Sequence, residues 1–295
     1  MKISWKYTLN LFKETLKEFN SDDVFAKAAA VSYYAVFALP GLMLISITVA
    51  TIIFDEQRVI DEFTEEFADV LGESGAQTFQ RLMTGVQQIE GSWIATTIGV
   101  LTLVFGSTAI FIQLQKSLNS IWDVTKKPDE GVKSMVRDRL ISLALVLILN
   151  ILFLLFLTLS TMMSAFNSWI STNMGAAVTF FSFLLNIGLS IAILAVVFAL
   201  VFKYLPDVEI SWRVVWPGAL ITAVLFTIGK ELIAFYLTHS DVGSTYGAGS
   251  AIILFLLWIY YSSLIVFFGA EFTQVYARKE GERLRPAENA QQVSG

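Results

Sequence analysis

The stretch from Ser250 to Tyr276, SAIILFLLWIYYSSLIVFFGAEFTQVY, decides the fold. It is apolar almost throughout, and its one charged residue, Glu271, lies close to its end. A helix needs about 20 residues to cross the roughly 30 Å hydrocarbon core of a bilayer. Because the stretch meets this length and carries so little charge, it predicts a membrane-spanning helix.

Five other stretches have the same character, and the composition agrees with them. Hydrophobic residues make up 55% of the 295 residues and charged residues only 15%, against about 25% charged in an ordinary soluble domain. The sequence therefore predicts an all-α, polytopic membrane protein with six transmembrane helices in residues 28–276. The first five predicted spans are Ala28–Phe54, Ser92–Leu114, Leu140–Met163, Ala177–Phe202 and Trp216–Leu237.

The distribution of lysine and arginine predicts the orientation of these spans. Seventeen of the twenty basic residues fall in residues 1–27 and in the segments after the second, fourth and sixth spans. Arg58 and Arg81 fall on the opposite side, and Lys230 falls inside the fifth span. By the positive-inside rule, both termini, including the polar tail 277–295, are expected to be cytoplasmic.

Two predicted elements lie outside the membrane. In the arm 1–27, an apolar stripe flanked by lysines predicts an amphipathic helix, which either lies on the inner leaflet or packs on the cytoplasmic ends of the spans. In the acidic outer segment 55–91, two apolar stripes separated by Gly72 and Gly75 predict a helical hairpin that caps the bundle. The stripe of the arm comprises Trp5, Leu9, Phe12, Leu16 and Phe19.

The residue inventory argues against several kinds of chemistry. The chain has no cysteine and one histidine, His239, so a thiol nucleophile, a disulfide and a His-cluster metal site are not expected. Cleavage of RNA requires a general acid and base, or a bound metal, beside a basic track that holds phosphate. We therefore expect neither an enzyme nor a nucleic-acid-binding protein, and no cofactor.

Polar residues near the middle of the first span are candidates for a function. Pro40, followed by Gly41, is expected to kink or break this span, and Tyr33 and Tyr34 place hydroxyl groups ahead of it. Such a helix either lines a cavity or is a kinked packing helix.

Three later spans also contain polar residues. Asn150 and Asn186 fall near mid-membrane, where an amide either joins two helices by a hydrogen bond or lines a polar path. Glu271 follows Gly269 and Ala270, small residues that allow another helix to come close. Its carboxylate is either an anchor that reaches the interface or a site inside the bundle.

Lys230 and Glu231 are adjacent charges in the fifth span. Each costs about 2.5 to 3.5 kcal/mol at mid-bilayer, so the pair requires compensation. Three explanations are open: a water-filled outer vestibule, side chains that reach the outer water, or a buried structural ion pair. The apolar segment between Pro217 and Gly229 is too short to cross a bilayer alone, which favours the vestibule.

Four stretches together resemble the YihY/BrkB family of bacterial inner-membrane proteins. They are KAAAVSYYAVFALPGLML at 27–44, LQKSLNSIWDV at 114–124, KYLPDVEISWRVVWPGAL at 203–220 and YGAGSAIILFLLWIYYSSLIVFFGAEFTQVYA at 246–277. The resemblance implies a six-helix protein of the bacterial inner membrane. Members of the family have been labelled virulence factors and, historically, ribonuclease BN, and export of envelope lipid has been suspected for relatives.

These observations favour a transporter, or an exporter of a lipid or another envelope component, whose partners are membrane lipids and a lipid or small amphipathic substrate. The alternative is a non-transporting membrane scaffold that binds envelope proteins, and the third possibility is a membrane enzyme that acts on lipid. The residues expected along a substrate path are Lys230, Glu231, Glu271, Tyr33, Tyr34, Pro40, Asn150 and Asn186.

Overall fold

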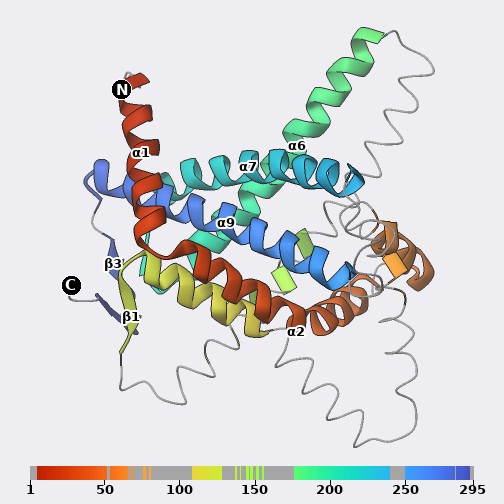
Figure 1. The fold of residues 1–295 in the computed structure, drawn as a ribbon, viewed down its shortest axis with the longest axis horizontal. Coiled ribbons are helices and arrows are strands. Elements are labelled where there is room, and N and C mark those ends of the chain that lie inside the picture. Colours follow the sequence, from red (N-terminus) through yellow and green to blue (C-terminus); the bar gives the residue numbers. More distant parts are fainter. Residues whose placement is uncertain are drawn as a thin grey trace, which may run out of the picture.

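Long helices dominate the computed structural model of the chain (Figure 1). The structure describes residues 5–51, 54–65, 108–127, 176–239, 250–282 and 284–292, with scattered shorter pieces between residues 68 and 155. Residues 108–121 are also helical. The long helices are α1 (Trp5–Ser21), α2 (Val24–Ala50), α6 (Ala176–Tyr204), α7 (Trp212–His239) and α9 (Ser250–Lys279).

Three of these helices contain segments long and apolar enough to cross a membrane. The segments are Ile187–Tyr204 in α6, Trp212–Ile233 in α7 and Ile252–Lys279 in α9. They correspond to the last three of the six predicted spans. Most of the second and third predicted spans lies outside the described residues, so those spans stay predictions.

The first predicted span corresponds to α2, which begins with the apolar segment Val24–Leu39 and remains helical to Ala50. Its backbone is helical through Pro40, so the expectation that the helix breaks there is wrong. A proline removes one backbone hydrogen bond from a helix, and a membrane helix tolerates that loss where its neighbours support it.

The fifth predicted span is longer than the sequence suggested. Residues 212–216 extend α7 ahead of Pro217, and the helix continues to His239. The segment is thus long enough to cross a bilayer, so its length does not support a vestibule beside Lys230. Helix α7 accommodates Pro217 in its interior, and its length therefore cannot be counted from that proline.

Helix α9 lies between α7 and α2 (Figure 1). It meets α7 at a reciprocal pair of glycines. A Cβ atom added to Gly218 would lie 1.8 Å from Thr273 Oγ1, and one added to Gly269 would lie 1.7 Å from Thr222 Oγ1. Each threonine hydroxyl donates a 2.7 Å hydrogen bond to the glycine carbonyl four residues earlier in its own helix. Small residues of this kind let two membrane helices approach closely.

Helix α1 packs against α9. Leu11 and Thr15 are buried, and the ring of Phe12 lies 5.5 Å from that of Phe272. Another face of α1 leaves three apolar side chains of the predicted stripe exposed, beside the lysines of the arm. These exposed residues are Trp5, Leu9 and Leu16.

Four short strands, which the all-α prediction did not include, join distant segments at the end of the bundle that holds both labelled chain ends (Figure 1). Strand β1 (Val124–Lys126) pairs antiparallel with β4 (Ala290–Gln292), and β2 (Val208–Glu209) pairs antiparallel with β3 (Arg285–Pro286). We call this end the polar end. The predicted polar tail 277–295 therefore contributes two strands, β3 and β4, which pair with strands from earlier in the chain.

The beginning of the outer segment packs on the end of α2. Residues 56–65 are helical, and Val59 is buried against Ile47 and Ala50. Ile60 and Phe63 pack against the same cluster. The rest of the segment lies mostly outside the described residues, so the predicted hairpin stays a prediction.

Candidate functional site

Glu271 is buried in α9 near the polar end. Its side chain is 0% exposed, and it lies eight residues, about 12 Å of helix, before Lys279. Gly269 brings α7 against this part of α9, and the carbonyl of Ala270 accepts a 3.3 Å hydrogen bond from the indole of Trp122. The anchor alternative does not fit this position, because no part of the side chain reaches the surface.

The carboxylate of Glu271 is unusual because no donor group supports it within the part of the chain that the structure describes. Neither Oε1 nor Oε2 accepts a hydrogen bond from an N–H or hydroxyl group there, and the side chain in contact with it is another carboxyl group, that of Asp22. The charged side chains in its electrostatic surroundings are Asp22, Glu18 and Lys27. An unpaired carboxylate in an apolar interior is costly, so this arrangement requires an explanation.

Asp22 lies at the elbow between α1 and α2 and is half-buried. Its pKa is raised above the usual aspartate range, and burial is the largest cause. The ammonium group of Lys27 opposes that shift, whereas the carboxylates of Asp123 and Glu18 add to it. Lys27 also donates a hydrogen bond to the backbone carbonyl of Asp22, which ties the elbow to the first turn of α2.

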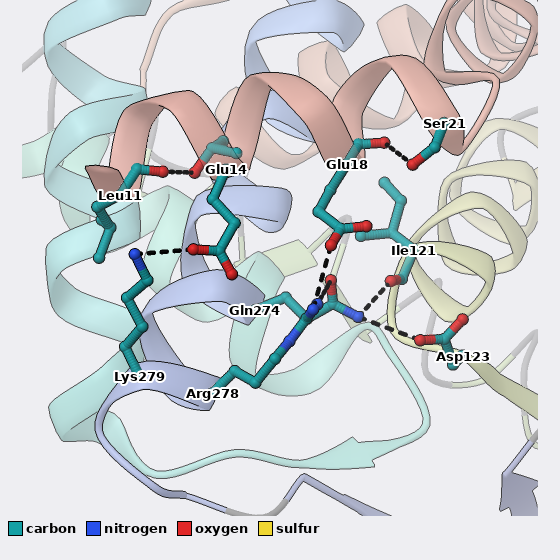
Figure 2. Close-up of polar contacts among 10 residues, drawn as sticks. Leu11, Glu14, Glu18, Ser21, Ile121, Asp123, Gln274, Arg278 and Lys279 are labelled. Atoms are coloured by element: carbon teal, nitrogen blue, oxygen red, sulfur yellow. Dashed lines mark hydrogen bonds and ion pairs between the residues drawn. The ribbon is translucent and has the colours of Figure 1, made fainter. Parts of the chain in front are cut away.

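Two polar residues follow Glu271 on the same face of α9, at helical steps of three and four. Figure 2 shows both of them facing α1 and the segment after the 108–121 helix. The side-chain amide of Gln274 donates to the carbonyl of Ile121 at 2.8 Å and to Asp123 Oδ2 at 3.4 Å. Arg278 donates to Glu18 Oε1 at 3.1 Å and to Gln274 Oε1 at 3.3 Å. The guanidinium group is therefore engaged by Glu18 and Gln274.

A second ion pair holds α1 on the end of α9. Lys279 Nζ lies 2.8 Å from Glu14 Oε2 (Figure 2). Lys279 follows Arg278 directly in α9, and Glu14 lies one helical turn before Glu18 in α1. We call this ion pair and that of Arg278 with Glu18 the α1 latch. The latch keeps the elbow that carries Asp22 next to the segment of α9 that carries Glu271.

Two residues with left-handed backbone conformation border the site. Asp23 has φ of 49° and Asp123 has φ of 53°, and they are the non-glycine residues with positive φ in the described ranges. Aspartate is among the residues that adopt this region most readily, at some cost in strain. Such conformations often occur at functional sites, where the surrounding structure enforces them.

A second buried carboxylate at the polar end is fully partnered. Asp207 Oδ1 accepts a 2.6 Å hydrogen bond from Asn289, and Oδ2 accepts a 2.7 Å hydrogen bond from Asn119. The backbone N–H of Asp207 donates to Asn119 Oδ1 at 2.8 Å. Lys126 and Arg137 lie 3.9 Å and 4.0 Å from its two oxygens. These groups join the 108–121 helix, the segment before β2 and the segment before β4.

The structure does not bring Lys230 and Glu231 to Glu271. Lys230 is half-buried and Glu231 is exposed. Gly229 lies against Tyr261 of α9, and about 15 Å of helix separates Tyr261 from Glu271. The two groups of charges are therefore separate features of the molecule.

The structure says less about the other residues that were predicted to lie along a substrate path. Tyr33 and Tyr34 are exposed, and their rings contact each other at 5.6 Å. Asn150 lies outside the described residues. Pro40 and Asn186 belong to α2 and α6, but their side chains also fall outside the described part of the chain. The role of these residues on a path stays a prediction.

Asp22 was not among the residues singled out from the sequence, and neither was Asp207. Asp22 carries a weak signal: it stands in the short polar break Ser21–Asp23 between two helical patterns. Asp207 and Asn119 lie inside two of the stretches that carried the family resemblance, at 203–220 and 114–124. Their mutual contact depends on the tertiary fold.

Comparison with known proteins places the chain among membrane proteins. The model of the family described as virulence factor BrkB matches residues 15–294. A UPF0761 membrane protein of Aggregatibacter aphrophilus is 25% identical over 96% of both chains. The ribonuclease-like protein YfkH of Bacillus subtilis is 23% identical over 92% of this chain and 97% of its own.

Other relatives are longer than this chain. A UPF0761 membrane protein of Methylibium petroleiphilum is 31% identical over 59% of this chain, a match that spans 40% of the relative. The match to a relative in Alkalilimnicola ehrlichii spans 59% of that protein. No solved structure matches the chain.

Proposed function

The chain belongs to the virulence factor BrkB family, and from this membership we propose that it is a multi-pass transporter of the bacterial inner membrane. In this proposal it exports a lipid or another amphipathic component of the envelope, and both termini are cytoplasmic. The polar end then faces the cytoplasm.

The observation that carries the proposal is the buried carboxylate of Glu271, to which no donor group in the described ranges forms a hydrogen bond. An ionisable side chain within a membrane-spanning segment is expensive, and such residues commonly mark ion or substrate pathways. A carboxylate with a purely structural role would be expected to have partners, as Asp207 has. A residue whose burial costs stability without visible compensation is better explained by a function that uses it.

The exposed face of α1 supports membrane lipid as a partner. Trp5 is 76% exposed, and Leu9 and Leu16 are also exposed. Lys13 and Lys17 lie near this apolar face in the helical projection. An apolar face with lysines along its border suits the interface of an anionic leaflet.

We do not extend the ribonuclease-like name of the Bacillus relative to this chain. Its one histidine, His239, ends α7 at the end of the helix remote from Gly218, and RNA cleavage needs acid–base or metal chemistry beside a phosphate-binding track. We therefore propose transport without a covalent reaction.

The test uses the purified full chain in liposomes that contain a lipid with a fluorescent head group. Export would move labelled lipid between leaflets, and a membrane-impermeant quencher added outside would report it. We expect Glu271→Gln to abolish the flux with normal reconstitution. The matched control Glu209→Gln, which changes an exposed glutamate of β2, should keep it.

Two outcomes would contradict the proposal. Flux that is equal in the wild type and in Glu271→Gln would remove the carboxylate from the transport path. A folded, reconstituted protein that moves none of a panel of envelope lipids, but retains specific envelope proteins in detergent extracts, would favour the scaffold alternative.

A further inference from the structure

We propose that Glu271 and Asp22 form a proton-binding site in which the two carboxyl groups hold one proton between them. The role of that proton as the coupling ion rests on the proposed function. Binding of the proton does not, because it can be measured without transport.

The geometry of the site presents two carboxyl groups with unequal access to water. Glu271 is wholly buried, and among the described residues no N–H or hydroxyl group donates a hydrogen bond to it. Asp22, which interacts with it electrostatically, is half-buried at the elbow between α1 and α2. Two neighbouring carboxylates in a poorly hydrated place are difficult to ionise together, and one shared proton relieves the repulsion.

The charged groups on the surrounding elements do not neutralise the pair. From α1, Glu18 adds negative charge, and from the segment after the 108–121 helix Asp123 does the same toward Asp22. On α9, Arg278 is engaged by Glu18 and Gln274. Lys27 is the nearby cation of α2, and its ammonium group binds the backbone carbonyl of Asp22.

The donor set suits a proton better than a metal ion. A divalent cation such as Ca²⁺ or Mg²⁺ takes about six or more oxygen ligands. Within the described ranges, no group of three or more His, Asp or Glu side chains is spaced to hold a metal ion. A proton needs only one lone pair of Glu271 or Asp22.

The same geometry gives the proton a route. Glu271 itself does not reach the surface, whereas Asp22, which interacts with it, is partly exposed to solvent. Asp22 can therefore accept a proton from water and pass it inward by protonating the Glu271 carboxylate, after which Asp22 is again ionised. The α1 latch holds the two groups together during this exchange.

The test is infrared difference spectroscopy of the full chain in lipid, with pH steps as the trigger. Protonated carboxyl groups absorb apart from the amide bands. We expect a protonated-carboxyl signal that is lost in Glu271→Gln and shifted in its pH dependence in Asp22→Asn. The control Glu209→Gln, at an exposed glutamate of β2, should keep the wild-type signal.

Addition of sodium, potassium or magnesium at fixed pH should leave this signal unchanged. A signal that survives unchanged in both Glu271→Gln and Asp22→Asn would overturn the proposal. Displacement of the signal by one of the metal ions would also overturn it, because the pair would then be a metal site.

The two proposals fail in different ways. If the carboxyl signal behaves as expected but lipid flux is absent, the proton site stands and the transporter proposal fails. If flux depends on Glu271 but no titrating carboxyl signal depends on it, the transporter proposal stands and the proton site is wrong. Circular dichroism of each variant confirms that it is folded.

Discussion

Asp207 and Glu271 are two buried carboxylates near the polar end that differ in the hydrogen bonds their oxygens accept. Asp207 is 7% exposed and Glu271 is 0% exposed. Each oxygen of Asp207 accepts a hydrogen bond from an asparagine, whereas neither oxygen of Glu271 accepts one from an N–H or hydroxyl group among the described residues. Burial alone therefore does not separate a structural carboxylate from a functional one, and the distinction depends on the partners of each oxygen.

The largest expected effect comes from Asp207→Asn. The new amide nitrogen would face an asparagine amide that donates to Asp207 in the wild type, so one buried hydrogen bond is lost and two donors oppose each other. We expect the free energy of unfolding to fall by about 3 kcal/mol. Thermal unfolding in detergent and abundance in the membrane would measure it.

The neighbouring substitution Glu209→Gln is the matched control, because Glu209 is exposed and lies two residues away in β2. It should change stability by less than about 0.5 kcal/mol. Equal effects of the two substitutions would show that the hydrogen bonds of Asp207 are not its main contribution.

The second effect concerns the crossing that places Glu271 in the interior. Gly269→Ala would put a methyl group against Thr222, and we expect a loss of about 1 to 3 kcal/mol. Thr222→Ala should relieve part of this loss in the double variant. Gly188→Ala in α6, where nothing lies within 4 Å, should stabilise by up to about 1 kcal/mol. Similar losses at both glycines would contradict the close crossing.

The isosteric change of carboxylate to amide, which should lower stability at position 207, should not lower it at Glu271. Glu271→Gln replaces a buried carboxyl group to which no described donor hydrogen-bonds, so we expect its thermal unfolding midpoint to equal or exceed that of the wild type. Retained stability together with lost flux would sharpen the comparison. A large loss of stability would instead reveal structural partners of Glu271.

The raised pKa of Asp22 predicts how its contribution to the stability of the fold changes with pH. Because its pKa is raised in the folded protein, the folded state binds the proton more tightly than the unfolded state. Its contribution is complete below the unfolded pKa of about 3.9, and it is lost as pH rises through the folded pKa. Asp22→Asn should therefore unfold at higher temperature than the wild type at neutral pH, with a smaller difference at pH 4. An unchanged pH profile would contradict this.

The smallest effect is expected at the α1 latch. A double-mutant cycle of Lys279→Met and Glu14→Gln should give a coupling energy below about 1 kcal/mol, because the side chain of Glu14 is 38% exposed and water competes for the pair. Unfolding midpoints at low and high salt would measure it, and salt should weaken the coupling. A coupling well above this value would make the latch a major contributor to stability.

The features that depend on local pattern could be predicted from the sequence, and those that depend on distant contacts could not. The apolar lengths of α6, α7 and α9 predict their membrane character, and the small residues before Glu271 predict a close approach of another helix. The helices continue through Pro40 and Pro217, and local propensity does not reveal the support that a packed helix receives.

The candidate site was half visible in the sequence. Glu271 stands out as one charge in an apolar stretch, but its lack of hydrogen-bond donors is a property of the folded chain. Asp22 joins it only because the elbow between α1 and α2 folds back beside α9. The strands of the polar end were missed because two or three residues carry too little periodicity to predict a strand.

The pairing of β3 and β4 with earlier strands also sets an order of events during synthesis of the protein. Asp207 and Asn119 can meet as soon as the segment before β2 leaves the ribosome, but Asn289 is added 82 residues later. Until Asn289 is synthesised, Asp207 Oδ1 lacks the hydrogen bond that this residue donates. Completion of the polar end thus follows translation of the long helices, because Asn289 comes after the last of them, α9.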